Sequence, residues 1–301
     1  MGDLFSILDK LQESMSDSIS VNDYVKKQQV RQNISKPFSQ KDMALIFLDI
    51  ESTGTDLEND RIIQLAFIKE KENKVEYYND LCYTDVRINY SAMGVHHITP
   101  EMIENECYPK DTQSFKKLED ENIPTNYFIT HNNTLDIAML ENEEIELLMK
   151  CIDTDKCARH LLKDAENYKL QTLRYQYGLY KSEKELLHKL GIDEIQAHDA
   201  LGDALLHYLL FKFLLKKVDG DINKLVTLTH TSVLLEKITF GKYKEQDMTF
   251  EELFNLDPMD FVWMYSQPMA LRWSELNDTL EYWLEKRPKY LKMAKEKRNL
   301  L

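Results

Sequence analysis

The feature that most constrains this fold is a continuous apolar run that ends in two carboxylates. From Ala44 the chain reads Ala-Leu-Ile-Phe-Leu-Asp-Ile-Glu, which ends at Glu51. Such a run is typical of a central strand that is covered on both faces. Because residues two apart on a strand point to the same face, Asp49 and Glu51 lie side by side. Two like charges repel each other there, so a divalent metal ion is the natural counter-ion, although an ordinary solvated strand end is the alternative for this pair alone.

The segments that follow this run predict a mixed α/β domain. Strand-like segments at 61–69 and 74–82 are joined by a polar turn, so with the first strand they form an antiparallel meander. Short strands at 127–130 and 151–153 then alternate with expected helices at 134–149, 154–164, 170–177 and 200–216. We therefore expect an α/β fold, with a mixed five-stranded sheet flanked by helices, over residues 42–218.

The two ends of the chain differ in composition from this central domain. Residues 1–41 form a polar extension, interpreted as a short surface helix and a linker, with a partner-binding peptide as the alternative. Residues 219–301 contain all three tryptophans and predict a small α-rich C-terminal module. Its basic tail, from Lys286 to Leu301, carries seven basic residues and one acidic residue. This tail is either a solvated helix end or a contact with a polyanion.

Charge and hydrophobicity restrict the partners. The chain has 38 Lys and Arg against 52 Asp and Glu, a net charge of −14, so a nucleic-acid substrate requires a local device such as bound metal. No apolar run approaches the ~20 residues of a membrane span, and no secretory signal pattern opens the chain. The four cysteines are widely spaced, which indicates reduced thiols. We therefore expect a cytoplasmic protein with no membrane partner.

Two further fragments contain candidate catalytic residues. The strand at 127–130 leads into His131-Asn-Asn-Thr-Leu-Asp136, which places Asp136 in the first turn of a helix, where an ordinary N-terminal carboxylate is the alternative. The long helix near residue 200 is preceded by His198 and carries Asp203. Five residues along a helix turn through about 140°, so His198 belongs to the approach loop and Asp203 to the helix.

Together, the three fragments resemble the DEDDh subgroup of the DEDD superfamily of 3′-to-5′ exonucleases, which includes the epsilon subunit of bacterial DNA polymerase III and exonuclease X. The D-x-E-T/S-T-G motif corresponds to Asp49–Gly54, H-N-x-x-F-D to His131–Asp136 with Leu135 in place of Phe, and H-x-A-x-x-D to His198–Asp203. A V-H-G-I-T-x-E-M segment corresponds to Val95–Met102, with His97 in place of Gly. The resemblance covers residues 43–216 and implies a ribonuclease H-like fold.

The resemblance also implies a catalytic apparatus. Asp49, Glu51, Asp136 and Asp203 would hold two Mg²⁺ ions, or Mn²⁺ as a substitute, for phosphodiester hydrolysis. His198 would be the general base, and the product would be a nucleoside 5′-monophosphate. Thr53 and His96 occupy positions that contact the terminal nucleotide in relatives. A turn hydroxyl and a solvated histidine are the alternatives for these two residues.

The C-terminal module has a weaker resemblance of its own. Phe240-Gly-Lys-Tyr-Lys, followed by Asp257-Pro-Met-Asp-Phe-Val-Trp263, resembles a module that follows the nuclease domain in some exonuclease X-like proteins. One interpretation is a stacking and phosphate-binding surface for single-stranded DNA, formed by Lys242, Tyr243, Lys244 and Trp263. The alternative is that Phe240, Phe261 and Trp263 form the core of a small domain.

The favoured function is a metal-dependent 3′-to-5′ exonuclease that acts on nucleic-acid 3′ ends, preferably of single-stranded DNA, in DNA repair or proofreading. An exoribonuclease that trims RNA is the alternative within the same chemistry. A non-catalytic nucleic-acid-binding or polymerase-associated scaffold ranks below both, because all four acidic residues are present. Association with a DNA polymerase is expected by analogy alone.

Overall fold

The computed structural model describes residues 43–192 and 199–299, so the N-terminal extension lies outside the described residues. Contacts divide the chain at Thr229 and His230. We call residues 43–229 the sheet unit and residues 230–299 the helical unit. The sequence had suggested a boundary near residue 219, but the helix α11 (Ile222–Thr229) packs against sheet-unit elements and so belongs with them.

The sheet unit is built on the mixed five-stranded sheet that the sequence predicts. The strands lie in the order β3-β2-β1-β4-β5, with β1 in the middle. β2 is antiparallel to both β1 and β3, whereas β4 is parallel to both β1 and β5. Their bounds are β1 (Leu45–Ser52), β2 (Ile62–Lys71), β3 (Lys74–Leu81), β4 (Tyr127–Thr130) and β5 (Lys150–Asp153). This antiparallel meander followed by parallel strands is a ribonuclease H-like arrangement.

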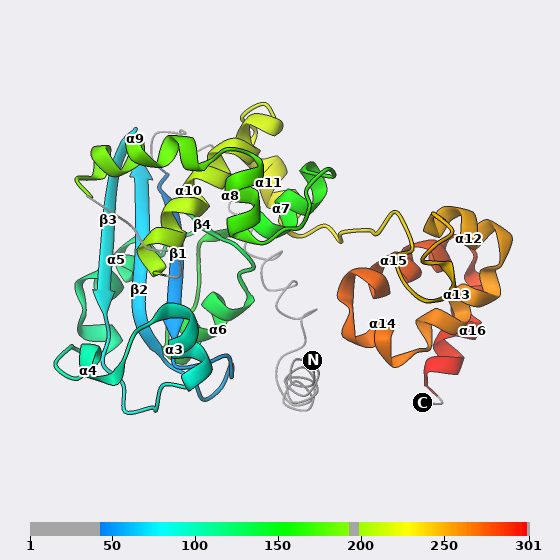
Figure 1. Cartoon of the computed structure of the whole chain (residues 1–301), viewed down its shortest axis with the longest axis horizontal. Coiled ribbons are helices and arrows are strands. Elements are labelled where there is room, and N and C mark those ends of the chain that lie inside the picture. Colours follow the sequence, from blue (N-terminus) through cyan, green and yellow to red (C-terminus); the bar gives the residue numbers. More distant parts are fainter. Residues whose placement is uncertain (1–42, 193–198, 300–301) are drawn as a thin grey trace. The chain divides into compact units, whose positions relative to one another are not determined.

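Helices cover both faces of the sheet (Figure 1). The long helix α10 (Ala200–Lys217) packs on one face against β1 and β2, together with α7 (Thr154–Leu161), α8 (Leu170–Gln176) and α11. The opposite face is covered by α5 (Gln113–Glu121) and α6 (Thr134–Asn142). The remaining helices of this unit are α3 (Tyr90–His96), α4 (Pro100–Ile103), η2 (Pro109–Asp111) and α9 (Tyr180–Leu190).

Alternation along β1 decides which face receives the carboxylates. Phe47 belongs to the core cluster under α10, where its ring contacts Phe211 at a centroid distance of 5.3 Å. Leu48 belongs to the cluster under α5 and α6. Since Asp49 and Glu51 have the same parity as Phe47, they lie on the α10 face.

One expected helix is shorter than predicted. The sequence predicted a helix over 134–149, but α6 ends at Asn142 and the backbone of Glu144 is left-handed, with φ of 66°. Beyond this turn Ile145, Leu147 and Met149 are buried at a spacing of two residues, which is the period of extended chain. The apolar residues in this stretch therefore lead into β5 rather than extend the helix.

The helical unit has its own core. Its elements are η3 (Gly241–Tyr243), α12 (Phe250–Leu256), α13 (Pro258–Tyr265), α14 (Pro268–Arg272), α15 (Ser274–Glu285) and α16 (Pro288–Arg298). Phe250, Phe254 and Phe261 pack edge to face in its centre. The basic tail forms α16, which packs on α13 and buries Ala294. Within the described ranges, no helix is long and apolar enough to cross a membrane.

Candidate active site

The site forms where two parallel strands separate. Pairing between β1 and β4 ends at Phe47 and Ile129, whereas β1 continues beside β2 to Ser52. The chain leaves β4 after Thr130 and enters α6, whose first turn contains Asp136. Open α/β sheets bind ligands at such a divergence, beyond the carboxyl ends of the strands. Asp49 and Glu51, which are partly exposed, therefore lie beyond the part of β1 that pairs with β4.

Three of the predicted acidic residues come together there. Asp49 and Glu51 from β1 and Asp203 from the first turn of α10 each place a carboxylate oxygen within 4.8 Å of the other two. All three side chains are partly exposed, so an ion from solvent can reach them. Oxygen donors at this spacing fit a hard divalent cation.

Asp136 is the fourth predicted ligand and lies beside this group. It is not one of the three clustered carboxylates, and it is only 7% exposed. Its negative charge nevertheless raises the pKa of both Asp49 and Glu51, which places its carboxylate near theirs. The site thus consists of three clustered carboxylates and a fourth, that of Asp136, which is more deeply buried than they are.

The acidic groups of the site have raised pKa values. Burial, followed by the charges of neighbouring acidic groups with Asp136 foremost, raises the pKa of Asp49 well above its usual range. Burial and the charge of Asp203 raise the pKa of Glu51 to about 8. Burial raises the pKa of Asp136 to about 7. Without a cation these groups hold their protons to higher pH than ordinary carboxyl groups do, whereas a divalent ion would compensate the charge that contributes to the shifts.

His207 on α10 contacts the backbone of β1, and the sequence analysis did not identify it. This buried histidine lies one turn after Asp203 on α10, and its Nδ1 is 2.9 Å from the carbonyl oxygen of Leu48. Since a carbonyl only accepts, Nδ1–H is the donor and Nε2 carries no proton. Burial lowers the pKa of His207 to about 3, so the ring is neutral at pH 7. Its Nε2 lies 3.9 Å from Asp49 Oδ1.

A second group of missed residues positions the start of α10. Asp199 caps this helix by accepting a hydrogen bond from the backbone N–H of Gly202, and it also accepts one from Gln64 Nε2 at 2.7 Å. The side-chain Oε1 of Gln64 accepts a hydrogen bond from the backbone N–H of Ala200 at 3.2 Å. Gln64 is paired with Glu51 across β1 and β2. The amide therefore connects the strand that carries Glu51 with the helix that carries Asp203.

Asp203 is also contacted from α8. Gln171 Nε2 donates to Asp203 Oδ1 at 3.3 Å, and Arg174 Nη1 donates to Gln171 Oε1 at 3.1 Å. The guanidinium of Arg174 in turn makes a two-point ion pair with Glu183 on α9, with both N–O distances at 2.6 Å. These contacts fix one Asp203 oxygen through a chain of side chains that spans three helices.

The remaining predicted site residues have different environments. His198 lies outside the described residues. Thr53 is buried; its hydroxyl donates to Asp60 Oδ1 at 2.6 Å and accepts from Arg61 N at 3.0 Å. His96 is also buried, and its Nδ1 accepts from Ile98 N at 3.0 Å. Both side chains therefore make contacts within the local fold, and a contact of either one with a nucleotide stays a prediction.

The fold and the acidic cluster define a ribonuclease H-like α/β domain with a carboxylate site for divalent metal. A model of the exonuclease family, that of ribonuclease T, matches residues 46–211, more than half of the chain. The chain therefore belongs to this family, the DEDD exonucleases.

The chain is also similar to individual proteins of known name. The PolC-type DNA polymerase III of Lacticaseibacillus paracasei is 27% identical over 139 residues, which is 44% of this chain but 9% of that protein. The DNA polymerase III epsilon subunit of Treponema pallidum is 26% identical over 147 residues, 46% of this chain and 66% of the relative. The chain thus corresponds to about a tenth of the PolC-type relative. Exonuclease X in complex with 5′-overhanging duplex DNA aligns over 62% of this chain and 99% of its own, with 20% identity and a TM-score of 0.46.

Proposed function

We propose that this protein is a divalent-metal-dependent 3′-to-5′ exonuclease that releases nucleoside 5′-monophosphates, preferably from single-stranded DNA, in repair or proofreading. The observation that carries the proposal is the convergence of Asp49, Glu51 and Asp203 within 4.8 Å of one another at the end of the central strand. Family membership supports phosphodiester hydrolysis as the use of this cluster.

The chain's own residues have distinct roles in this proposal. Asp49, Glu51 and Asp203 bind the principal cation, and Asp136 supports a second ion. Mg²⁺ is the favoured metal and Mn²⁺ its substitute. When bound, two such ions lower the pKa of water and stabilise charge on the attacking and leaving oxygens. His198 accepts the proton of the attacking water, since an imidazole of ordinary pKa accepts protons near neutral pH.

An exposed aromatic side chain supports a nucleic-acid substrate. The backbone N–H of Asn89 donates to the carbonyl oxygen of Thr53 at 2.8 Å, so the start of α3 is anchored two residues from Glu51. The next residue, Tyr90, is 76% exposed and has the guanidinium of Arg87 4.8 Å from its ring centroid. An exposed ring with a stacked cation suits a base and its phosphate in a single strand.

Association with a DNA polymerase is the biological setting in this proposal. It is supported by the names of the relatives, which are DNA polymerase III proteins. Co-purification of the full chain with a polymerase would test it separately from the chemistry.

The proposed activity is tested with the purified protein and Mg²⁺ on matched 3′-labelled single-stranded DNA, duplex DNA and RNA, beside a 5′-labelled control. We expect mononucleotide release from single-stranded DNA. Asp49→Asn should lose at least 100-fold in activity, because it removes a carboxylate that binds the principal cation. This factor corresponds to roughly 2.7 kcal/mol of lost transition-state stabilisation. Glu58→Gln, which alters an exposed carboxylate just beyond β1, should retain activity. Turnover that persists in excess EDTA would contradict the proposal, and faster release from RNA would select the exoribonuclease alternative.

A further inference from the structure

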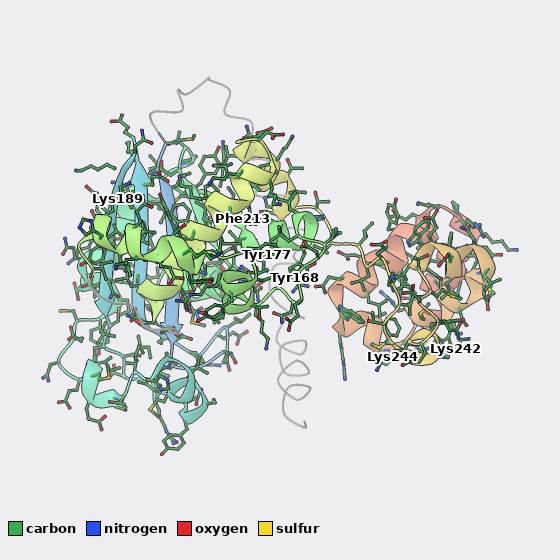
Figure 2. All side chains as sticks on the ribbon, turned by 45° about the horizontal axis from the view of Figure 1, so that its top comes forward. Tyr168, Tyr177, Lys189, Phe213, Lys242 and Lys244 are labelled. Carbon is green, nitrogen blue, oxygen red and sulfur yellow. The ribbon has the colours of Figure 1, made fainter. Side chains whose placement is uncertain are left out.

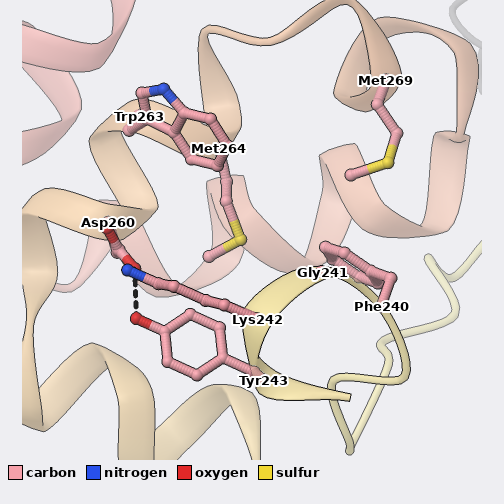
Figure 3. A pocket seen from close by; sticks show the side chains of 8 residues that line it. All are labelled: Phe240, Gly241, Lys242, Tyr243, Asp260, Trp263, Met264 and Met269. Carbon is pink, nitrogen blue, oxygen red and sulfur yellow. Dashed lines mark hydrogen bonds and ion pairs between the residues drawn. The ribbon is translucent and has the colours of Figure 1, made fainter.

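The helical unit contains a pocket that the chemistry at the carboxylates does not use. It has a volume of about 540 Å³, within the range of roughly 300–1,000 Å³ that is typical of small-molecule sites. Figure 3 shows its walls, which come from the turn around η3, from α13 and from α14. The lining residues are Phe240, Gly241, Lys242, Tyr243, Asp260, Trp263, Met264 and Met269.

The apolar wall of the pocket includes side chains that are exposed to solvent and are not part of the buried core. Phe261, Val262, Met264 and Tyr265 on α13 are buried, whereas Trp263 between them is 50% exposed. The sequence alternative that Phe240, Phe261 and Trp263 all form a core therefore fits Phe261 and the partly buried Phe240, but not Trp263. Met269 across the pocket is also exposed. A solvent-facing indole beside a methionine is an apolar surface available to a flat, polarisable ligand.

One edge of the pocket is polar. Asp260 accepts a hydrogen bond from the hydroxyl of Tyr243 and forms an ion pair with Lys242 at 2.8 Å (Figure 3). The Lys242 ammonium also lies 4.8 Å from the centroid of the Tyr243 ring. The pocket thus combines stacking surfaces with a fixed acceptor and donor at its rim. A nucleobase has this same combination of apolar faces and a hydrogen-bonding edge, whereas an aliphatic peptide anchor has no polar edge to match.

Charge around the pocket is compatible with a phosphate backbone. Of the chain's 38 basic and 52 acidic residues, 11 and 12 lie in 230–301, so this region is nearly neutral and most of the acid excess lies elsewhere. Lys242, which lines the pocket, and Lys244, two residues further along the chain, are both exposed, and Figure 2 labels them. Lys244 in particular can meet a phosphate next to a bound base.

We propose that this pocket binds an unpaired base of single-stranded nucleic acid, with the base stacked on Trp263 and its polar edge at Asp260 and Lys242. The inference rests on the proposed function, because it assigns the substrate strand a second contact that is separate from the carboxylates. Lys244 contacts a neighbouring phosphate.

The test uses the full chain carrying Asp49→Asn, in EDTA, so that a labelled single-stranded oligonucleotide is not degraded. Fluorescence anisotropy should show that adding Trp263→Ala weakens binding roughly 5- to 100-fold, the usual effect of removing one stacking side chain. Trp263→Phe retains an aromatic face and should lose less. Tyr282→Ala is the matched control, since it removes an exposed aromatic residue of the same unit that does not line the pocket. Lys244→Ala should reduce the dependence of binding on salt.

A second measurement separates this inference from the proposed function. In the otherwise unaltered enzyme, Trp263→Ala should leave hydrolysis of a p-nitrophenyl ester of thymidine 5′-monophosphate unchanged, because this small substrate is hydrolysed at the carboxylate site and is too short to occupy the second contact as well. Equal oligonucleotide binding by Trp263→Ala and Tyr282→Ala would overturn the inference even if nuclease activity is confirmed. Self-association of the chain that disappears in Trp263→Ala would also overturn it, because the pocket would then be a protein interface.

Discussion

At the scale of single residues, the candidate site is a group of acidic side chains that the fold holds close together although they repel one another. Asp49, Glu51 and Asp136 all have raised pKa values, each with burial as the largest cause. Burying like charges together disfavours the folded state unless a ligand compensates them. Neutral residues such as His207 and Gln64 surround this group and fix the backbone that carries it. The distinction between groups that bind the cation and groups that position them can be tested.

His207→Ala is the variant that tests positioning. Removing the ring leaves the carbonyl of Leu48 without its Nδ1–H donor, and we expect the free energy of unfolding to fall by about 1–3 kcal/mol. Because Leu48 precedes Asp49, we also expect half-maximal activity to require several-fold more Mg²⁺. A Mg²⁺ titration measures the second effect and thermal denaturation the first. His188→Ala, at an exposed position on α9, is the control. Lower stability with an unchanged Mg²⁺ requirement would assign His207 to packing alone.

At the scale of secondary-structure elements, sequence patterns predicted the features that depend on residues close together in the chain. The buried run of β1 and its alternation were sufficient to place Asp49 and Glu51 on one face, and the start of α10 was sufficient to place Asp203. Contacts such as Gln64 with Asp199 join segments far apart in the chain and leave no periodic signal. The length of α6 was overestimated because Leu147 and Leu148 fit a helical pattern as well as an extended one.

Two adjacent leucines distinguish a helical from an extended conformation of residues 143–149. Leu147 is 3% exposed and belongs to the core cluster under α5 and α6, whereas Leu148 is 39% exposed. Leu147→Ala should therefore lower the free energy of unfolding by about 2–5 kcal/mol, and Leu148→Ala by no more than about 0.5 kcal/mol. Chemical denaturation of the two variants measures the difference. Similar losses from both would indicate that this stretch does not alternate.

At the scale of the whole molecule, the acidic cluster links stability to pH and to metal. The pKa of Glu51 is about 8 and that of Asp136 about 7, both above the ordinary values of carboxyl groups near 4. Between these limits the folded state without metal binds more protons than the unfolded state. Stability therefore decreases as pH rises from about 4 through about 8, since its slope with pH follows the difference in bound protons.

A divalent cation binds the deprotonated cluster and should reverse part of this trend. We expect the increase in melting temperature on adding Mg²⁺ to be small at pH 5, where protons occupy the carboxylates, and to grow towards pH 8. Differential scanning fluorimetry across this range, with and without Mg²⁺, measures the effect. Asp49→Asn removes one carboxylate and one repulsive charge, so it should melt at a higher temperature than the unaltered protein in EDTA at pH 8 and gain less from Mg²⁺. A Mg²⁺ effect that is equally large at pH 5, or unchanged by Asp49→Asn, would mean that the cation acts away from this cluster.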